Sequence, residues 1–443
     1  MTFTKKNLGQ FFTVNPDVQA VMASLLVNRT GAALEPSSGD GDLVAVLEQF
    51  PYARIDAVEL DPTKGGKSKT SPTYQDFFLF ASQALEAGRS YDVIFGNPPY
   101  VPWKSVEPET VENAASVKAA YTDKVNLSVL FMDRALDLLA PGGEIVFIVP
   151  KEWFFATAAA PLRAKFATGG SFSHLIDCGE EKLFADASIP SLLIFRWVKG
   201  TKSSPCLFAP DLAVAKAGRY QTKTLSTTTA GLFCLLSPDL AADIAGWRTL
   251  CEQYAPKVGL VSAADAVFKL GDGVQIETEL VQYQVDTTRA RARFLNANHI
   301  EAWADMPPQA AQYLLSHKPE LLARKIAVFS EANWWKYGAV RNQEIMKTAT
   351  ARFYVLAKTR RADPAFVGSP CESFTGALLA LFARPEALIP IEAAVKLFNS
   401  PRYREILAGM MLIAGGRLSL HQATLEELPF PRQEAELRRF LAR

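Results

Sequence analysis

Short apolar runs alternate with stretches of helical spacing between residues 30 and 200. The apolar runs predict six strands, at Ala32–Glu35, Ile55–Leu60, Val93–Gly96, Glu144–Val149, Leu175–Cys178 and Ser191–Val198. Asp42–Phe50 and Asn126–Ala140 carry apolar residues at helical intervals, and Pro141-Gly142-Gly143 ends the second helix. This alternation predicts a doubly wound, mostly parallel α/β sheet. Because Gly179–Pro190 is too short for an ordinary helical crossover, we expect the final strand to run antiparallel.

The pattern becomes less regular after residue 200. Residues 199–230 are rich in Lys, Ser, Thr and Ala and poor in large hydrophobic side chains, which predicts a linker. We therefore expect a first domain over residues 1–200, a linker over 201–230 and a second α/β domain over 231–443. In the second domain, helical spacing or strand-like runs mark Gln309–Ser316, Glu392–Phe398, Arg402–Leu412, Val281–Val285 and Ala351–Lys358.

Composition and charge limit the kind of protein. Of the 443 residues, 49% are hydrophobic and 21% are charged, so two folded domains are expected rather than a disordered or fibrous chain. A net charge of +1 argues, taken alone, against a strongly basic nucleic-acid binder. However, residues 1–200 hold 18 Lys and Arg against 23 Asp and Glu, whereas residues 201–443 hold 29 against 23. The second part is therefore the basic one.

The five cysteines are scattered without a Cys-x-x-Cys pair, and the four histidines are isolated. Neither a disulfide framework nor a metal site is predicted, and a reducing cytoplasm is the expected location. No apolar segment follows the polar residues Met1–Asn7, so we expect no secretory signal. The most apolar stretch, Ile406–Gly416, has about half the length of a membrane span, and no membrane association is expected.

The strongest chemical signal is Asn97-Pro98-Pro99-Tyr100, which directly follows a predicted strand. Open α/β sheets bind ligands at the carboxyl ends of their strands. An amide or aromatic amino nitrogen is a poor nucleophile because its lone pair is delocalised. The Asn97 side-chain oxygen and the Pro98 carbonyl can accept its two N–H groups, and the prolines hold both acceptors in place. Since Tyr100 offers a ring for stacking, the motif indicates group transfer to a planar amine.

Two other strand ends predict a nucleoside cofactor. The first strand ends in Glu35-Pro36-Ser37-Ser38-Gly39-Asp40, and the helix after it offers backbone N–H groups to an anionic ligand group. This loop has neither the G-x-G-x-x-G nor the Walker pattern, so a dinucleotide or nucleoside triphosphate is not favoured. A second strand ends near Glu59, where an acid can accept hydrogen bonds from both ribose hydroxyls.

Together these residues resemble the class I, S-adenosylmethionine-dependent methyltransferases, and more narrowly the gamma class of adenine-N6 DNA methyltransferases, the TaqI-like family of restriction–modification systems. In that family a segment over the cofactor precedes the glycine loop, and Gly9-Gln10-Phe11-Phe12-Thr13 matches it. Tyr74-Gln75-Asp76-Phe77 resembles the pair that receives the adenine end of the cofactor. The Gly-, Lys- and Ser-rich residues between Pro62 and Tyr74 depart from the family, because they leave the usual crossover helix tiny or missing.

The resemblance also implies roles for individual residues. It places S-adenosylmethionine against Phe12, Thr13, Glu35, Pro36, Ser37, Gly39, Asp40, Glu59, Asp76 and Phe77. It assigns methyl transfer to Asn97, Pro98 and Tyr100, with Phe184 stacking on the other face of a flipped adenine. The expected partner is double-stranded DNA, bound by a monomer, with a cognate restriction endonuclease as a candidate companion.

Other functions share part of this pattern. A protein-glutamine N5 methyltransferase also uses Asn-Pro-Pro-Tyr, because a carboxamide poses the same nucleophile problem, but such enzymes are shorter. An RNA adenine methyltransferase and a catalytically inactive DNA-specificity protein also stay open as alternatives.

The basic second part contains candidate DNA contacts. Arg289, Arg291 and Arg293 alternate along the sequence and would share one face of an extended strand. Lys336 lies among aromatic residues, and Arg360 and Arg361 follow Lys358-Thr359. Each cation is equally compatible with an ordinary solvated face, so these positions are expectations only.

Overall fold

The computed structural model describes residues 13–179, 183, 191–201, 205–228, 231–288, 290–324, 329–346, 348, 352–359, 367–369, 373–414 and 417–443. Five residues expected in functional sites lie outside these ranges, namely Phe12, Phe184, Arg289, Arg360 and Arg361. The chain divides into two compact units. The first comprises Met1–Ala245 and Ile406–Gly415, and the second comprises Gly246–Glu405 and Gly416–Arg443.

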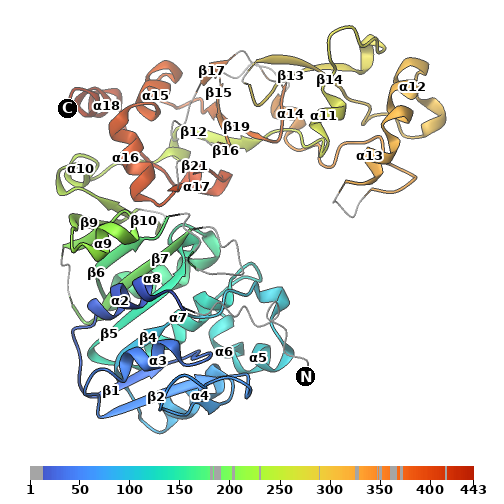
Figure 1. Cartoon of the computed structure of the whole chain (residues 1–443). Coiled ribbons are helices and arrows are strands. Elements are labelled where there is room, and N and C mark those ends of the chain that lie inside the picture. The colour runs from blue at the N-terminus through green and yellow to red at the C-terminus, as the bar shows by residue number, and fades with distance from the viewer. Residues whose placement is uncertain are drawn as a thin grey trace. The chain divides into compact units, whose positions relative to one another are not determined.

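A ten-stranded sheet forms the centre of the first unit (Figure 1). Its order is β10-β9-β8-β6-β7-β5-β4-β1-β2-β3. The strands are β1 (Ala32–Glu35), β2 (Arg54–Glu59), β3 (Thr73–Tyr74), β4 (Tyr91–Gly96), β5 (Leu139–Pro150), β6 (Gly170–Asp177), β7 (Leu192–Lys199), β8 (Cys206–Ala209), β9 (Gln221–Thr227) and β10 (Phe233–Leu236). Strands β1 to β5 pair in parallel, and β7 lies antiparallel between β5 and β6. The expected mostly parallel sheet is therefore confirmed, and β7 is antiparallel as expected, but it is not the final strand because β8 to β10 continue the sheet.

Helices cover both faces of this sheet. α2 (Pro16–Ser24), α3 (Asp42–Leu47) and α9 (Leu212–Lys216) pack on one face, and α4 (Phe77–Glu86), α7 (Leu127–Leu138) and α8 (Ala160–Gly169) pack on the other. Neighbouring residues of β4 point to opposite faces, so that Val93 and Phe95 join the first layer and Ile94 joins the second. Burial on both faces explains why these strands are continuously apolar. Shorter helices are α5 (Pro108–Asn113), α6 (Ala115–Lys118) and α10 (Pro238–Asp243).

The segment expected to be a linker, residues 201–230, instead continues the sheet. β8 pairs in parallel with β6, and β9 pairs antiparallel with both β8 and β10. The prediction was wrong because β9 is partly exposed along its length and needs few large apolar side chains. Residues Ile406–Gly415 return to the same unit, where Gly409 packs closely on β10: a Cβ there would lie 2.4 Å from the Leu235 carbonyl oxygen.

The second unit is built from smaller sheets. One has the order β12-β19-β15-β17 and another β14-β13-β18, while β11 pairs with β22. The strands of this unit are β11 (Arg248–Thr249), β12 (Tyr254–Val258), β13 (Val281–Val285), β14 (Arg291–Leu295), β15 (Arg352–Leu356), β16 (Lys358–Thr359), β17 (Val367–Ser369), β18 (Ser373–Phe374), β19 (Leu378–Ala383), β21 (Arg417–Ser419) and β22 (Pro429–Phe430), whereas β20 (Ile413–Ala414) belongs to the first unit. The helices are α11 (Asp265–Phe268), α12 (Pro308–Ser316), α13 (Lys318–Leu322), α14 (Gln343–Met346), α15 (Ile391–Phe398), α16 (Pro401–Gly409), α17 (Gln422–Glu426) and α18 (Glu434–Leu441). None of the helices among the described residues is long and apolar enough to cross a bilayer.

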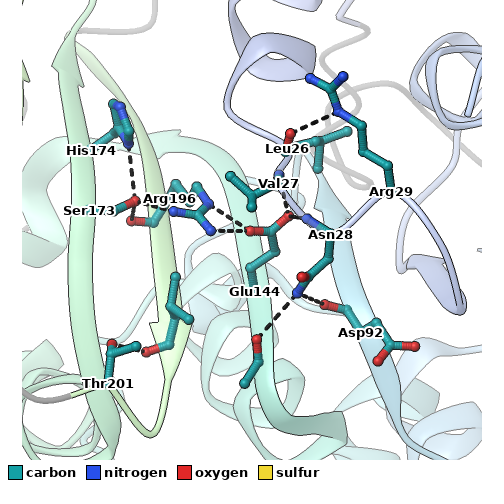
Figure 2. Close-up of polar contacts among 12 residues, drawn as sticks. Leu26, Val27, Asn28, Arg29, Asp92, Glu144, Ser173, His174, Arg196 and Thr201 are labelled. Atoms are coloured by element: carbon teal, nitrogen blue, oxygen red, sulfur yellow. Dashed lines mark hydrogen bonds and ion pairs between the residues drawn. The ribbon is translucent and has the colours of Figure 1, made fainter.

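A buried ion pair fastens the N-terminal helix α2 to the sheet of the first unit, as Figure 2 shows. Glu144 of β5 is fully buried, and its Oε2 accepts a hydrogen bond of 2.6 Å from Nε of Arg196 on β7. Its Oε1 accepts the backbone N–H groups of Val27 and Asn28, which follow α2, at 2.8 and 2.9 Å. The Asn28 side chain donates in turn to the Asp92 carbonyl on β4. This network therefore connects α2 to three strands.

We expect Glu144→Gln to lower the free energy of unfolding of the first unit by about 3 kcal/mol, because Arg196 would lose its counter-ion in a buried place. Urea unfolding followed by circular dichroism would measure the shift. The control is Asp137→Asn, which removes the partly exposed pairs of Asp137 with Arg134 and Lys165 and should cost about 1 kcal/mol or less. Equal shifts for the two variants would show that the Glu144 pair does not hold the fold in this way.

Candidate active site

A pocket lies where β1, β2 and β4 end in the first unit. Its lining contains Thr13, Glu35, Pro36, Ser37, Ser38, Gly39, Asp42, Leu43, Glu59, Leu60, Gln75, Asp76, Phe77, Asn97, Pro99, Val101, Val106, Glu107, Thr110, Leu127 and Phe131. The carboxyl ends of neighbouring parallel strands thus contribute Glu35, Glu59 and Asn97 to one cavity. The structure brings together eight residues predicted to hold a cofactor, namely Thr13, Glu35, Pro36, Ser37, Gly39, Glu59, Asp76 and Phe77, and places Asn97 beside them.

Asp40 is the exception among the described cofactor candidates. Left-handed glycines on either side, Gly39 at φ +54° and Gly41 at φ +95°, turn the chain sharply at this point. The Asp40 carboxylate therefore faces Lys64, at 3.4 Å, and it is absent from the pocket lining. Asp42 lines the pocket instead and pairs with Lys67.

The Gly-, Lys- and Ser-rich segment between β2 and β3 contains no helix, as the sequence predicted. It lies against the glycine loop instead: the Lys67 N–H donates to the Asp40 carbonyl at 2.8 Å. A Cβ on Gly41 would lie 2.6 Å from Ser68 Oγ, so only glycine permits this approach. The segment thus supports the loop that faces the pocket.

Two polar atoms in the pocket wall have no hydrogen-bond partner. Glu35 is 1% exposed; its Oε1 accepts the Ser37 N–H at 3.2 Å, whereas its Oε2 is unpartnered, as is Ser38 Oγ. Burial raises the pKa of Glu35 well above its usual range. A buried carboxylate with an unpartnered oxygen is costly unless a cation or donor reaches it. This corner of the pocket therefore fits a ligand that carries an ammonium group.

Glu59 lies beside that corner and already holds the glycine loop. Its two carboxylate oxygens accept the backbone N–H groups of Gly39 and Asp61, at 2.7 and 2.9 Å. Burial raises its pKa above the ordinary value. Since each carboxylate oxygen can accept a second hydrogen bond, both remain able to receive a hydroxyl group from a ligand.

The far end of the pocket suits a flat ring. Asp76 is the N-cap of α4, where it accepts the Phe78 N–H at 2.9 Å, and its other oxygen accepts the Thr110 hydroxyl at 2.7 Å. Burial raises the pKa of Asp76. Phe77 stacks on Phe131 of α7 with ring centres 4.6 Å apart. Sequence reasoning missed Thr110, which no motif marks, and Phe131, which it placed only on an apolar helix face.

Asn97 is held at both ends of its side-chain amide. Its Nδ2 donates to Thr13 Oγ1 at 3.0 Å, and its Oδ1 accepts the Tyr100 hydroxyl. Burial raises the pKa of Tyr100 well above its ordinary value, so this hydroxyl stays protonated; it also lies 3.0 Å from the Ile148 carbonyl oxygen. The side chain of Gln19 on α2 donates to the Thr13 carbonyl at 2.6 Å. Residues far apart in the sequence thus fix the orientation of one amide.

Three of the cations predicted to contact DNA lie among the described residues of the second unit, and their surroundings differ. Arg291 of β14 is exposed and stacks on Tyr283 of β13, 3.8 Å from the ring centre, and Tyr283 is itself 44% exposed. Arg293 donates to the Val274 carbonyl at 3.2 Å, and Lys336 lies 3.3 Å from a Glu301 carboxylate oxygen. The aromatic neighbours of Lys336, including Trp334 and Trp335, are buried core residues rather than a surface for stacking bases.

The sequence is similar to those of several known proteins. Residues 51–184 match the family model described as Eco57I restriction-modification methylase. The chain is 31% identical over 200 residues to the Type II methyltransferase M.HincII of Haemophilus influenzae. The matched region covers 44% of this chain and 38% of M.HincII. It is 25% identical over 334 residues to the Type II methyltransferase M.TthHB8I of Thermus thermophilus, covering 71% and 73% of the two chains. The chain resembles restriction–modification methyltransferases.

The likeness in fold extends further than the likeness in sequence. The structure resembles that of MmeI, a Type IIL restriction–modification enzyme that was solved in complex with DNA. The match covers 96% of this chain and 63% of the MmeI chain, with a TM-score of 0.57 and 10% sequence identity. The chain therefore shares a fold with MmeI over most of its length. The chain spans 38% and 37% of the lengths of M.HincII and the similar M.HindII.

The fold and these relatives support S-adenosylmethionine as the cofactor, and the pocket fits that molecule. The partnerless oxygens of Glu35 and Ser38 suit an ammonium group, Glu59 suits ribose hydroxyls, and Phe77 with Asp76 suits an aromatic ring that bears an amino group. Each of these groups is present in S-adenosylmethionine.

We expect Thr13→Val to lower kcat for methyl transfer about fivefold while the Kd for the cofactor product, S-adenosylhomocysteine, changes less than twofold. Valine has the same shape as threonine but leaves the Asn97 amide without its 3.0 Å partner, a hydrogen bond worth ~1 kcal/mol. Thr13→Ser keeps the hydroxyl and is the matched control, so it should retain most of kcat. A fall in cofactor affinity with unchanged kcat would mean that Thr13 acts only on the cofactor.

Proposed function

We propose that this protein transfers a methyl group from S-adenosylmethionine to N6 of an adenine in double-stranded DNA, as the modification enzyme of a restriction–modification system. The observation that carries the proposal is the oriented Asn97 amide at the wall of a pocket suited to that cofactor. A separate basic unit in the same chain supports a polyanionic substrate.

Asn97 and Pro98 would act on the amino group of the substrate. The cofactor, when bound, supplies a methyl group on a sulfonium. Asn97 Oδ1 has a lone pair besides the one that receives the Tyr100 hydroxyl, so it can accept one N–H of the amine, while the Pro98 carbonyl accepts the other. Two such hydrogen bonds shift electron density onto the nitrogen as it attacks. Because both acceptors are fixed in advance, little reorganisation is needed at the moment of transfer.

An adenine inside a duplex cannot reach this pocket, so the base must be extruded at a cost of a few kcal/mol. We assign Tyr100 and Phe184 to stacking on the extruded base, at ~1–3 kcal/mol for each ring, which offsets that cost. The Tyr100 hydroxyl is tied to Asn97, so the same bond that orients the amide also restricts rotation of the ring.

Charge separates the two units in the way that this function needs. The first unit holds 22 Lys and Arg against 26 Asp and Glu, and the second holds 25 against 20. We therefore assign DNA contact mainly to the second unit, with the exposed Arg291 and Tyr283 on its β13–β14 pair as the first candidates. Monomeric action, a cytoplasmic location and a cognate endonuclease belong to the same proposal.

An RNA adenine is the second candidate substrate. This chain is 31% identical over 127 residues to the tRNA1(Val) (adenine(37)-N6)-methyltransferase of Edwardsiella ictaluri, and the matched region covers 27% of this chain. The Type II methyltransferase M.TthHB8I matches a larger share of the chain, 71%. We therefore favour DNA over RNA, and both over a protein glutamine.

Asn97→Ala should reduce methylation of DNA at least about 100-fold, because the developing charge on the amine loses a preorganised acceptor. Incorporation of labelled methyl groups into plasmid DNA would be measured, and sequencing for modified adenines would give the site. S-adenosylhomocysteine binding should stay within about threefold, and Asn113→Ala, outside the pocket lining, is the control. Absence of methylated adenine with the wild-type protein would reject the proposed function; methylated RNA alone would select the second candidate.

Arg291→Ala should lower the slope of log Kd against log salt for DNA binding by about one unit, the effect of one lost phosphate contact. Fluorescence anisotropy of a labelled duplex at several salt concentrations would measure it. Arg438→Ala on α18 removes an exposed cation that pairs with Glu434, and we expect no change in slope. An unchanged slope in Arg291→Ala would take that residue out of the DNA contact.

A further inference from the structure

Thr110 lies at the end of the cofactor pocket that suits a flat ring. It belongs to α5 and lines the cavity, as do Val106 and Glu107 of the chain just before that helix. Its side chain is buried, and its hydroxyl donates to Asp76 Oδ2 at 2.7 Å, whereas its backbone carbonyl accepts the Ala114 N–H inside the helix. The hydroxyl therefore serves Asp76 rather than the helix to which it belongs.

Among the described residues, Asp76 accepts three hydrogen bonds from the protein. As the N-cap of α4, it accepts the Phe78 and Leu79 N–H groups on Oδ1, at 2.9 and 3.3 Å, and it accepts the Thr110 hydroxyl on Oδ2. The two oxygens of a carboxylate offer about four positions that can accept a hydrogen bond. One acceptor position therefore remains, and it is on the oxygen that Thr110 orients.

The Thr110 hydroxyl also affects the ionisation of Asp76. Burial raises the pKa of Asp76, whereas the hydrogen bonds from Thr110, Leu79 and Phe78 lower it. Without the hydroxyl, the effect of burial would be opposed less, and the protonated acid would be favoured more. This difference matters for recognition, because a carboxylate only accepts hydrogen bonds, whereas a carboxylic acid can also donate one.

We propose that Thr110 is a positioning residue for the cofactor, which acts through Asp76 and makes the pocket select a 6-aminopurine ring over a 6-oxopurine ring. The remaining acceptor position on Asp76 Oδ2 receives an N–H of the 6-amino group, and it repels the oxygen that a 6-oxopurine carries in the same place. Phe77, which stacks on Phe131 in the same wall, offers an apolar contact that does not distinguish the two rings. This inference rests on S-adenosylmethionine as the cofactor of the proposed function, and it does not depend on which substrate is methylated.

Binding of two cofactor products to the full chain tests this selection without any methyl transfer. S-adenosylhomocysteine is compared with its deaminated analogue S-inosylhomocysteine, in which an oxygen replaces the 6-amino group. Isothermal titration calorimetry measures the Kd of each ligand, and the ratio of the two Kd values measures the selection. For the wild type we expect S-adenosylhomocysteine to bind at least about 30-fold more tightly, because the oxo ligand leaves a buried acceptor unpaired.

Variants of Thr110 separate its effect on selection from its effect on packing. Thr110→Val keeps the shape of the side chain but removes the hydroxyl, and it should reduce the ratio to about fivefold or less. Thr110→Ser keeps the hydroxyl and should retain the wild-type ratio within about twofold. In Thr110→Val, S-inosylhomocysteine should also bind more tightly as the pH is lowered, because protonated Asp76 can then donate to its oxygen.

Thr168→Val is the matched control. It removes an exposed hydroxyl on α8, outside the lining of the pocket, and should leave the ratio as it is in the wild type. Thermal unfolding checks that each variant is folded. Thr110→Ala removes the same hydroxyl as Thr110→Val with less bulk, so it is held to the same expectation where valine prevents folding.

The inference is overturned if the wild type does not bind S-adenosylhomocysteine, if it binds both ligands equally, or if the hydroxyl-free variants keep the wild-type ratio. Weaker binding of both ligands by the same factor would keep that ratio and would show that Thr110 only supports the shape of the pocket. Failure of the proposed function appears separately, as absence of methylated nucleic acid together with normal cofactor binding.

Discussion

The Glu144–Arg196 ion pair is the interaction on which the rest of the site depends. It lies at the amino ends of the strands, where Glu144 also receives the backbone after α2. The nine residues of α2 span about 14 Å at 1.5 Å per residue, and the other end of the helix lies next to Thr13. Asn15 caps that end by accepting the Asp17 N–H. A contact near the amino ends of β4 and β5 therefore helps to position a hydroxyl group at the carboxyl end of β4, beside Asn97.

Three buried carboxyl groups line the cofactor pocket. Burial raises the pKa of Glu35, Glu59 and Asp76, yet each carboxyl is also held by backbone or hydroxyl donors that stabilise its charge. Burial of these three acids at the ends of neighbouring elements therefore costs desolvation free energy in the protein without a ligand. A cationic ligand with several hydroxyl and amino donors offsets that cost when it binds, because it supplies the partners that the empty wall lacks.

The sequence predicted the core of the first unit well because its signals are local. Strands buried on both faces are continuously apolar, so Ala32–Glu35 was matched without error, and Glu59 and Asn97 were placed correctly at strand ends. The contribution of Thr110 could not be predicted, because it reaches Asp76 only through the packing of α5. Asp40 was misplaced because the φ angles of two glycines, which the sequence does not show, decide which side chain enters the pocket.

Segments with mixed polarity were harder to predict for a related reason. The polar composition of residues 201–230 is the same for a linker and for a half-exposed strand, and only pairing of β9 with β8 and β10 distinguishes them. Conversely, the aromatic residues around Lys336 look like a stacking surface in sequence, but a unit of this size needs them for its core.

The net charge of the whole chain hides a difference between the two units. A whole-chain value of +1 averages a first unit with an excess of four acids and a second unit with an excess of five bases. The acidic excess suits a sulfonium cofactor, and the basic excess suits phosphates. An excess of five cations is modest beside the linear charge density of DNA, so it supports only ordinary non-specific affinity. If the chain acts on DNA as proposed, discrimination between DNA sequences must come from directed contacts such as stacking and base-edge hydrogen bonds, because an electrostatic attraction of this size is the same for every sequence.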